Sequence, residues 1–258
     1  MYRINLLSLL ILALFLQLSG CVTVNEGGGG ATDFEKASKI NVQLGIGYYN
    51  RGNLELANEK LLKAIRQDPK SSQAYHAYAV LQNRFLDPEK AEFYFKKSIE
   101  LNPRNSEALN NYGAFLCSAK RIQESETMFL RAIDNQAYRS PEVAYTSAAV
   151  CLLKEGDVAK NREKAIGYLR RALAIGSNYR PALINMAAIT LEENNNELTR
   201  LYLERFNITG NPTARSLWLS IQNDLAMGDT SKIGLLTEQL ENDFSDSEEY
   251  KQWLALDK

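Results

Sequence analysis

The residues best suited to chemistry in this chain are one histidine and three cysteines, His76, Cys21, Cys117 and Cys151. One histidine cannot build a His-rich metal site, and no motif of known catalytic spacing accompanies it. We therefore expect no catalytic residue, no metal and no cofactor, and interpret His76 as lining a binding surface, with a catalytic base as the alternative. The 258 residues carry 30 Lys and Arg against 31 Asp and Glu, which argues against nucleic-acid binding.

Cys21 follows a segment typical of a secretory signal peptide. Arg3 provides a positive start, and residues 6–18 form a mostly apolar stretch that is shorter than the ~20 residues needed to span a membrane. The stretch ends in Leu18-Ser19-Gly20-Cys21, which resembles the bacterial lipobox. That resemblance implies that residues 1–20 are a lipoprotein signal peptide and that Cys21 becomes acylated. The alternative is a plain signal peptide in which Cys21 stands by chance.

The residues after Cys21 indicate where such a lipoprotein would lie. Val22 is not the aspartate that, by the same resemblance, retains lipoproteins at the inner membrane. We therefore expect a lipid anchor at the periplasmic face of the outer membrane. Residues 21–33 contain a run of four glycines, typical of a flexible linker with a reach of about 20 Å.

The rest of the chain repeats with a period of 34 residues. Pairs at this step are Ala57 and Ala91, Pro69 and Pro103, Tyr78 and Tyr112, and Phe95 and Phe129. These positions match the signature of the tetratricopeptide repeat, which the chain resembles. In the first repeat the signature positions are Leu44, Gly45, Tyr48, Ala57, Leu61, Ala64 and Pro69. The resemblance implies an all-α fold, a right-handed superhelix of about six helix-turn-helix repeats that bury their apolar faces by stacking.

We expect one repeat domain over residues 34–258. Its repeats are predicted at about 38–71, 72–105, 106–141, 142–179, 180–213 and 214–246, followed by a capping helix over 247–258. The fourth repeat departs from the pattern, because its predicted inter-helix turn, Gly156 to Lys164, is four residues longer than Gly52 to Leu56.

Cys117 and Cys151 fall late in the first helices of adjacent repeats. Such helices run side by side, with ~8–10 Å between their axes, so the thiols could form a disulfide in an oxidising periplasm. Aligned on Lys120 and Gly156, however, the two positions differ by about half a helical turn. Two buried, reduced cysteines are therefore the open alternative.

The repeat family places its binding surface in the concave groove lined by the first helices. Val42, Ile46 and Tyr49 share one helical face at i, i+4 and i+7, and an exposed apolar face suits a peptide. The alternative is that the linker or neighbouring residues cover Val42 and Ile46. The expected groove residues are Val42, Ile46, Tyr49, Asn50, His76, Val80, Asn83 and Asn110.

A lipoprotein with about six such repeats resembles the PilF/PilW family of type IV pilus biogenesis. Residues 18–21, 37–49, 75–84 and 110–117 carry this resemblance. It implies a pilotin, a non-enzymatic adaptor that binds the outer-membrane secretin and promotes its localisation and multimerisation. Twitching motility would then depend on it, and no nucleic acid or small-molecule substrate would be bound. The other candidates are an adaptor for cell-wall hydrolases or outer-membrane protein assembly, and a periplasmic enzyme.

Overall fold

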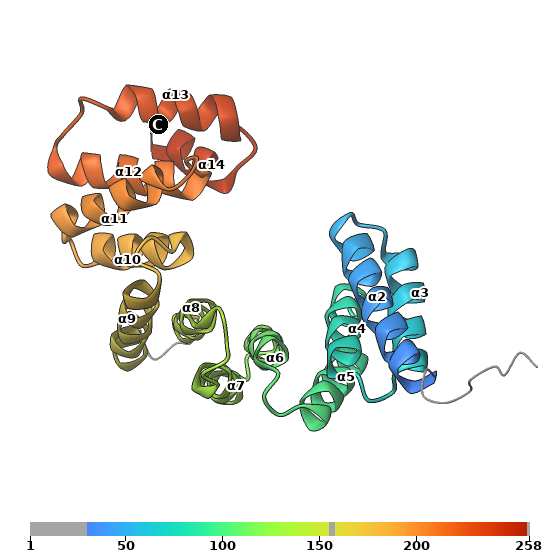
Figure 1. Cartoon of the computed structure of the whole chain (residues 1–258). Helices are drawn as coiled ribbons and strands as arrows, with labels where there is room; N and C mark the ends of the chain where they lie inside the picture. The colour runs from blue at the N-terminus through green and yellow to red at the C-terminus, as the bar shows by residue number, and fades with distance from the viewer. Residues whose placement is uncertain (1–29, 155–157, 257–258) are drawn as a thin grey trace, which may run out of the picture.

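The computed structural model describes residues 30–154 and 158–256, and all regular structure in these two ranges is helical. The thirteen described helices follow one another along a curved array (Figure 1). They are α2 (Gly30–Asn50), α3 (Leu54–Gln67), α4 (Ser72–Arg84), α5 (Pro88–Leu101), α6 (Ser106–Ser118), α7 (Ile122–Asp134), α8 (Pro141–Leu152), α9 (Val158–Ile175), α10 (Arg180–Glu192), α11 (Asn196–Ile208), α12 (Ala214–Met227), α13 (Ile233–Phe244) and α14 (Glu248–Leu256).

The helices pair into six hairpins that stack in chain order. Each even-numbered helix from α2 to α12 packs against the odd-numbered helix after it, and neighbouring hairpins contact one another. Figure 1 shows α2 and α3 at one end of the array and α12 to α14 at the other. The predicted all-α superhelix of tetratricopeptide hairpins is therefore confirmed.

The helix starts are specified locally by side chains that cap free backbone N–H groups. Asn53, Ser71, Asp87 and Asn105 each accept a hydrogen bond from the N–H group three residues later, at 3.0–3.2 Å. Such a cap satisfies one of the donors that have no partner inside the helix and contributes about 1 kcal/mol. The starts of helices α3, α4, α5 and α6 can therefore be read from the sequence, because a capping Asn, Ser or Asp precedes each of them.

Small residues let the two helices of a hairpin approach closely. A Cβ atom added to Gly45 on α2 would lie 2.5 Å from Leu61 Cγ on α3, and one added to Gly113 on α6 would lie 2.7 Å from Phe129 Cε1 on α7. Leu61 and Phe129 are both almost fully buried. The recurring glycine therefore leaves the space that the large side chain of the facing helix occupies.

The C-terminal end of the array is closed by α14. This helix packs against α12 and α13, and its Tyr250 and Trp253 contact the buried cluster of Leu217, Trp218, Ile221 and Leu240. Helix α14 therefore covers the face of the last hairpin on which a seventh hairpin would otherwise stack.

Three predictions of local structure need correction or lie beyond the described residues. Helix α2 begins at Gly30, so residues 30–33 are helical although the sequence predicted a linker to residue 33. The extra residues of the fourth repeat lengthen α9 to 18 residues, against 13 or 14 in α3, α5, α7 and α11, so residues 158–164 are helical instead of forming a long turn. The predicted signal peptide and Cys21 lie outside the described residues. No helix in the described part is long and apolar enough to cross a membrane.

Candidate partner-binding groove

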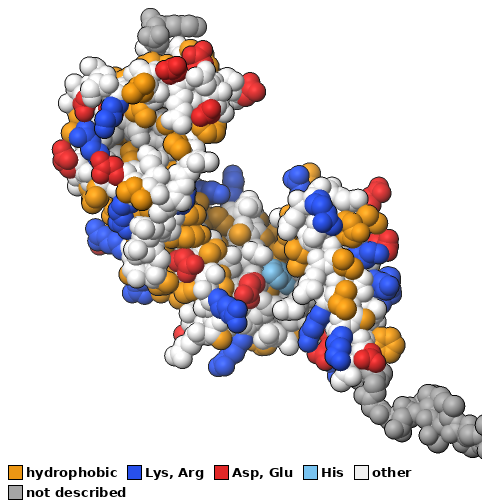
Figure 2. All heavy atoms as spheres, turned by 45° about the horizontal axis from the view of Figure 1, so that its top comes forward, with side chains coloured by type: hydrophobic (Ala, Val, Ile, Leu, Met, Phe, Trp, Pro, Cys, Tyr) orange, Lys and Arg blue, Asp and Glu red, His pale blue; other side chains and the backbone are white. Residues whose placement is uncertain are grey.

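A pocket of about 510 Å³ lies on the first helices of the first three hairpins. Figure 2 shows a hollowed face in which the pale-blue imidazole of the chain's one histidine is visible. The lining residues combine aliphatic side chains with amides; they are Val42, Gln43, Ile46, Tyr49, Asn50, Leu61, Gln73, His76, Ala77, Val80, Asn105, Glu107 and Asn111.

The apolar part of the pocket has a buried floor and an exposed rim. Val42 is only 6% exposed and packs in one cluster with Ala57 and Leu61 of α3, whereas Ile46, one turn later on α2, is 44% exposed. The expectation that both side chains are open is therefore wrong for Val42, because α2 turns that position toward α3. Ile46 remains accessible to a partner.

The polar part of the pocket is held by His76 on α4. The side-chain amide of Asn111 on α6 lies 2.8 Å from His76 Nε2, in position to donate a hydrogen bond to a neutral imidazole. Burial disfavours the charged ring and lowers the pKa of His76 to about 4. His76 is therefore neutral near pH 7, and this pairing joins the second and third hairpins across the pocket.

The pocket contains little charge. Glu107 supplies its one acidic side chain, and none of the residues that line it is Lys or Arg. A segment that relies on its own carboxylates would find no cation here to pair with. The arrangement instead suits a neutral or apolar segment whose backbone meets the side-chain amides of Asn50 and Gln73.

The structure brings together most, but not all, of the expected groove residues. Ile46, Tyr49, Asn50, His76 and Val80 line the pocket together with the buried Val42, whereas Asn83 and Asn110 do not.

The error at Asn110 has a geometric cause. Asn110 follows His76 by 34 residues, yet its side chain is buried, and the adjacent Asn111 faces His76. Asn111 lies 34 residues after Ala77, which itself lies 34 residues after Gln43, and all three line the pocket, so this repeat position faces the groove in each of the three hairpins. In the sequence, only the presence of a second asparagine directly after Asn110 pointed to Asn111 as a groove residue. Gln43, Leu61, Ala77 and Asn105 also line the pocket without having been expected.

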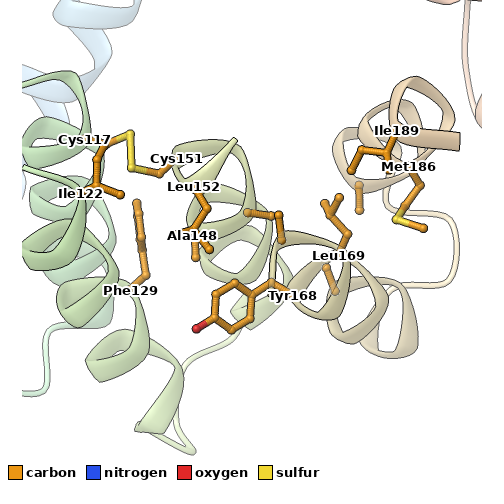
Figure 3. Packing of buried hydrophobic residues seen from close by; sticks show 14 residues of the cluster. Cys117, Ile122, Phe129, Ala148, Cys151, Leu152, Tyr168, Leu169, Met186 and Ile189 are labelled. Carbon is orange, nitrogen blue, oxygen red and sulfur yellow. A yellow bond between two sulfur atoms is a disulfide. The ribbon is translucent and has the colours of Figure 1, made fainter. Parts of the chain in front are cut away.

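Cys117 on α6 and Cys151 on α8 form a disulfide in the structure (Figure 3). Their Cα atoms are 5.8 Å apart, within the range that a disulfide requires. The expected half-turn offset is wrong, because the residues are 34 positions apart and so occupy equivalent places in adjacent repeats. The bridge lies at the edge of the buried cluster that includes Phe129 and Leu152.

Within the described ranges, no three His, Cys, Asp or Glu side chains are grouped closely enough to hold a metal ion. The neighbours of His76 are the amide of Asn111 and the ring of Phe95, whose centroid is 6.3 Å from that of the imidazole. These two contacts fix the position of the histidine ring.

Comparisons with known proteins agree with this architecture. Residues 94–127 match the tetratricopeptide repeat family. Type IV pilus assembly protein PilF of Pseudomonas aeruginosa is 30% identical over 248 residues, which cover 95% of this chain and 97% of PilF. A solved structure of Pseudomonas aeruginosa PilF superposes with a TM-score of 0.76 at 29% identity, over 87% of this chain and 99% of that one. The structure of PilW, a widely conserved type IV pilus biogenesis factor, gives 0.73 at 26% identity, over 84% and 98%. The chain therefore belongs to the PilF/PilW family of tetratricopeptide-repeat proteins.

Proposed function

We propose that the protein is a pilotin of type IV pilus biogenesis. It is anchored by acylated Cys21 at the periplasmic face of the outer membrane, binds the secretin subunit in the groove, and promotes its localisation and multimerisation. The observation that carries this proposal is the 30% identity to a type IV pilus assembly protein over nearly the whole of both chains. A relationship of that extent makes the same biological process the first expectation for this chain.

The groove supplies the chemistry for capturing a segment of the secretin. Ile46 and Val80 present an apolar surface to which an aliphatic or aromatic side chain of the partner can bind, at about 25 cal/mol per Å² of apolar area buried. The amides beside them can satisfy the partner's backbone groups as these lose water. An extended or helical segment without acidic residues fits this lining best.

The anchor would add to what the groove alone achieves. Acylation at Cys21 confines the domain to the membrane that the secretin must reach, which raises the effective concentration of groove and partner there. Binding and localisation are then coupled without catalysis, since holding the subunits at one surface is enough to favour their encounter.

A second adaptor function rests on the same architecture. A tetratricopeptide lipoprotein could present cell-wall hydrolases or components of outer-membrane protein assembly, because a neutral apolar groove does not by itself specify the partner. The relationship to PilF favours the secretin over these alternatives.

Site-specific crosslinking in cells tests the proposal. A photoreactive amino acid is placed at Ile46 in the groove, and a matched control is placed at Ile175, which is 52% exposed at the end of α9. The proposal predicts a crosslink to the secretin from position 46 and none from position 175. A crosslink from position 46 to a hydrolase or an assembly protein, with no secretin product, would establish the alternative.

A further inference from the structure

The side of α2 that points away from the following hairpins is apolar, and no described part of the chain covers it. Ile40 and Leu44 are 56% and 42% exposed, and Gly47 continues the same helical face. We refer to Ile40, Leu44 and Gly47 as the N-terminal end face. At about 100° per residue, Ile40 lies roughly 120° around the helix from Ile46, so this face is separate from the groove.

The equivalent positions are buried in the hairpins that follow. Ala74, Tyr78 and Leu81 of α4 lie 34 residues after the three end-face positions and are buried in one cluster with Ala57 and Leu61 of α3. The face is therefore the surface through which a hairpin stacks on the hairpin before it.

The third hairpin repeats this arrangement. Ala108, Tyr112 and Phe115 of α6 are buried, and the rings of Tyr112 and Phe115 lie 5.6 and 5.8 Å from the ring of Phe95 on α5. In the first hairpin no described residue precedes α2 to fill this role. The two ends of the array thus differ, because α14 covers the other end with Tyr250 and Trp253.

We propose that the N-terminal end face lies against the lipid bilayer. This inference rests on the proposed acylation of Cys21, which would leave residues 21–29 between the anchor and α2. Nine residues span at most about 30–32 Å even when fully extended, so the anchor holds the start of α2 within that distance of the headgroups. This segment is also too short to form a helical hairpin that could stack on the end face.

The charges of α2 are compatible with a bilayer surface. Lys36 and Lys39 are exposed, and their side chains are long enough to reach phosphate groups while their stems cover apolar surface. Lys39 also pairs with Glu35 at 3.8 Å, and Asp33 adds a second acidic side chain in the first turn. The contact therefore depends mainly on burial of Ile40 and Leu44 at the interface and on the anchor.

Such a contact would fix the orientation of the domain. With the end face on the bilayer, Ile46 and the groove would point away from it, and the other hairpins, which Figure 1 shows extending away from α2, would reach into the periplasm. The groove would stay open to a partner that is itself entering the membrane, instead of being covered by lipid.

Tryptophan scanning in vesicles tests this contact. The lipidated mature chain, which begins at Cys21, is reconstituted into phosphatidylethanolamine and phosphatidylglycerol vesicles containing lipids brominated in their acyl chains. Leu44→Trp reports on the end face. Ile46→Trp is the matched control, because its position is equally exposed on the groove side of the same helix. Trp218 and Trp253 are present in every variant, so each measurement is a difference from the parent chain. Ile40→Trp replaces Leu44→Trp if that variant loses helicity.

We expect brominated lipids to remove the added emission of Leu44→Trp and to leave that of Ile46→Trp unchanged. Vesicle-bound protein in which neither tryptophan is quenched would overturn the proposed contact and leave the lipid anchor standing. Protein that does not sediment with vesicles would contradict acylation and, with it, the contact. Disulfide-linked dimers of an Ile40→Cys variant would instead assign the face to a second copy of the chain.

Discussion

Val42 and Ile46 lie one turn apart on α2, but the structure assigns them opposite roles. Val42 is 6% exposed and belongs to the cluster of Ala57, Leu61 and Ala64, whereas Ile46 is 44% exposed on the rim of the groove. Val42→Ala removes two buried methyl groups, at about 0.8 kcal/mol each, and leaves a cavity, so we expect a loss of about 2 kcal/mol in the free energy of unfolding. Ile46→Gln keeps the side-chain length and helix propensity, and we expect a change below ~1 kcal/mol.

These two energies translate into separable measurements. A loss of about 2 kcal/mol lowers the Tm of a domain of this size by about 4–8 °C, which thermal melting followed by circular dichroism resolves. Binding of the purified secretin subunit is titrated on the same proteins. We expect Val42→Ala to melt early and bind with nearly unchanged affinity, and Ile46→Gln to melt normally and bind more weakly by about tenfold or less, since roughly 1 kcal/mol of apolar contact is lost.

The reverse pattern would refute this assignment. If Ile46→Gln lowered the Tm as much as Val42→Ala and left secretin binding unchanged, Ile46 would belong to the core and the partner would bind elsewhere. The double variant should show the sum of both effects, a stability loss from Val42 and an affinity loss from Ile46.

Three further perturbations test the packing and the electrostatics of the repeats. Cys117 and Cys151 should resist alkylation in unreduced protein, and free alkylation without reductant would disprove the disulfide. Replacing both cysteines with serine should lower the free energy of unfolding by at most about 4 kcal/mol, the value for a loop of this length. Gly45→Ala should overpack against α3, lowering the Tm and costing about 1–3 kcal/mol of stability. The added carbon of Gly47→Ala meets only the tip of an arginine side chain, at 3.8 Å, so this variant should gain up to ~1 kcal/mol of stability. Equal effects of the two variants would contradict the close approach of α2 and α3 at Gly45. Burial lowers the pKa of His76 to about 4, whereas the pKa in the unfolded chain is about 6.5. The free energy of unfolding in urea should therefore fall as the pH drops from 6.5 to 4, by at most ~1.4 kcal/mol per pH unit, and His76→Gln should lack this pH dependence. The same pH profile in both proteins would argue against a buried neutral imidazole.

The repeat architecture could be predicted from the sequence because packing forces the same residue types to recur. Gly45 faces Leu61 and Gly113 faces Phe129 across their hairpins, so the same small residue recurs at twice the repeat length. The helix starts were also readable, since Asp87 followed by proline marks both a cap and a first-turn residue. These signals are local or strictly periodic, and the fold preserves both.

The details of the groove and of the fourth repeat depend on geometry that the repeat signature does not contain. Asn111, at the repeat position of Gln43 and Ala77, meets His76 while Asn110 is buried, and the approach of α3 decides that Val42 is buried while Ile46 is not. The four additional residues of the fourth repeat could extend either the turn or the helix. They extend α9, because each residue added to an existing helix gains a backbone hydrogen bond for the entropy it loses and needs no new nucleation.

Secretin multimers in the outer membrane measure the central claim most directly. A deletion strain is complemented with the wild-type chain, with Cys21→Ser or with Ile46→Gln, and the secretin is quantified as multimer and monomer in separated membranes. A pilotin role predicts that the wild type restores outer-membrane multimers, that Cys21→Ser leaves monomers in the wrong membrane, and that Ile46→Gln restores fewer multimers than the wild type while remaining in the outer membrane. Full multimers in the deletion strain itself would contradict the account.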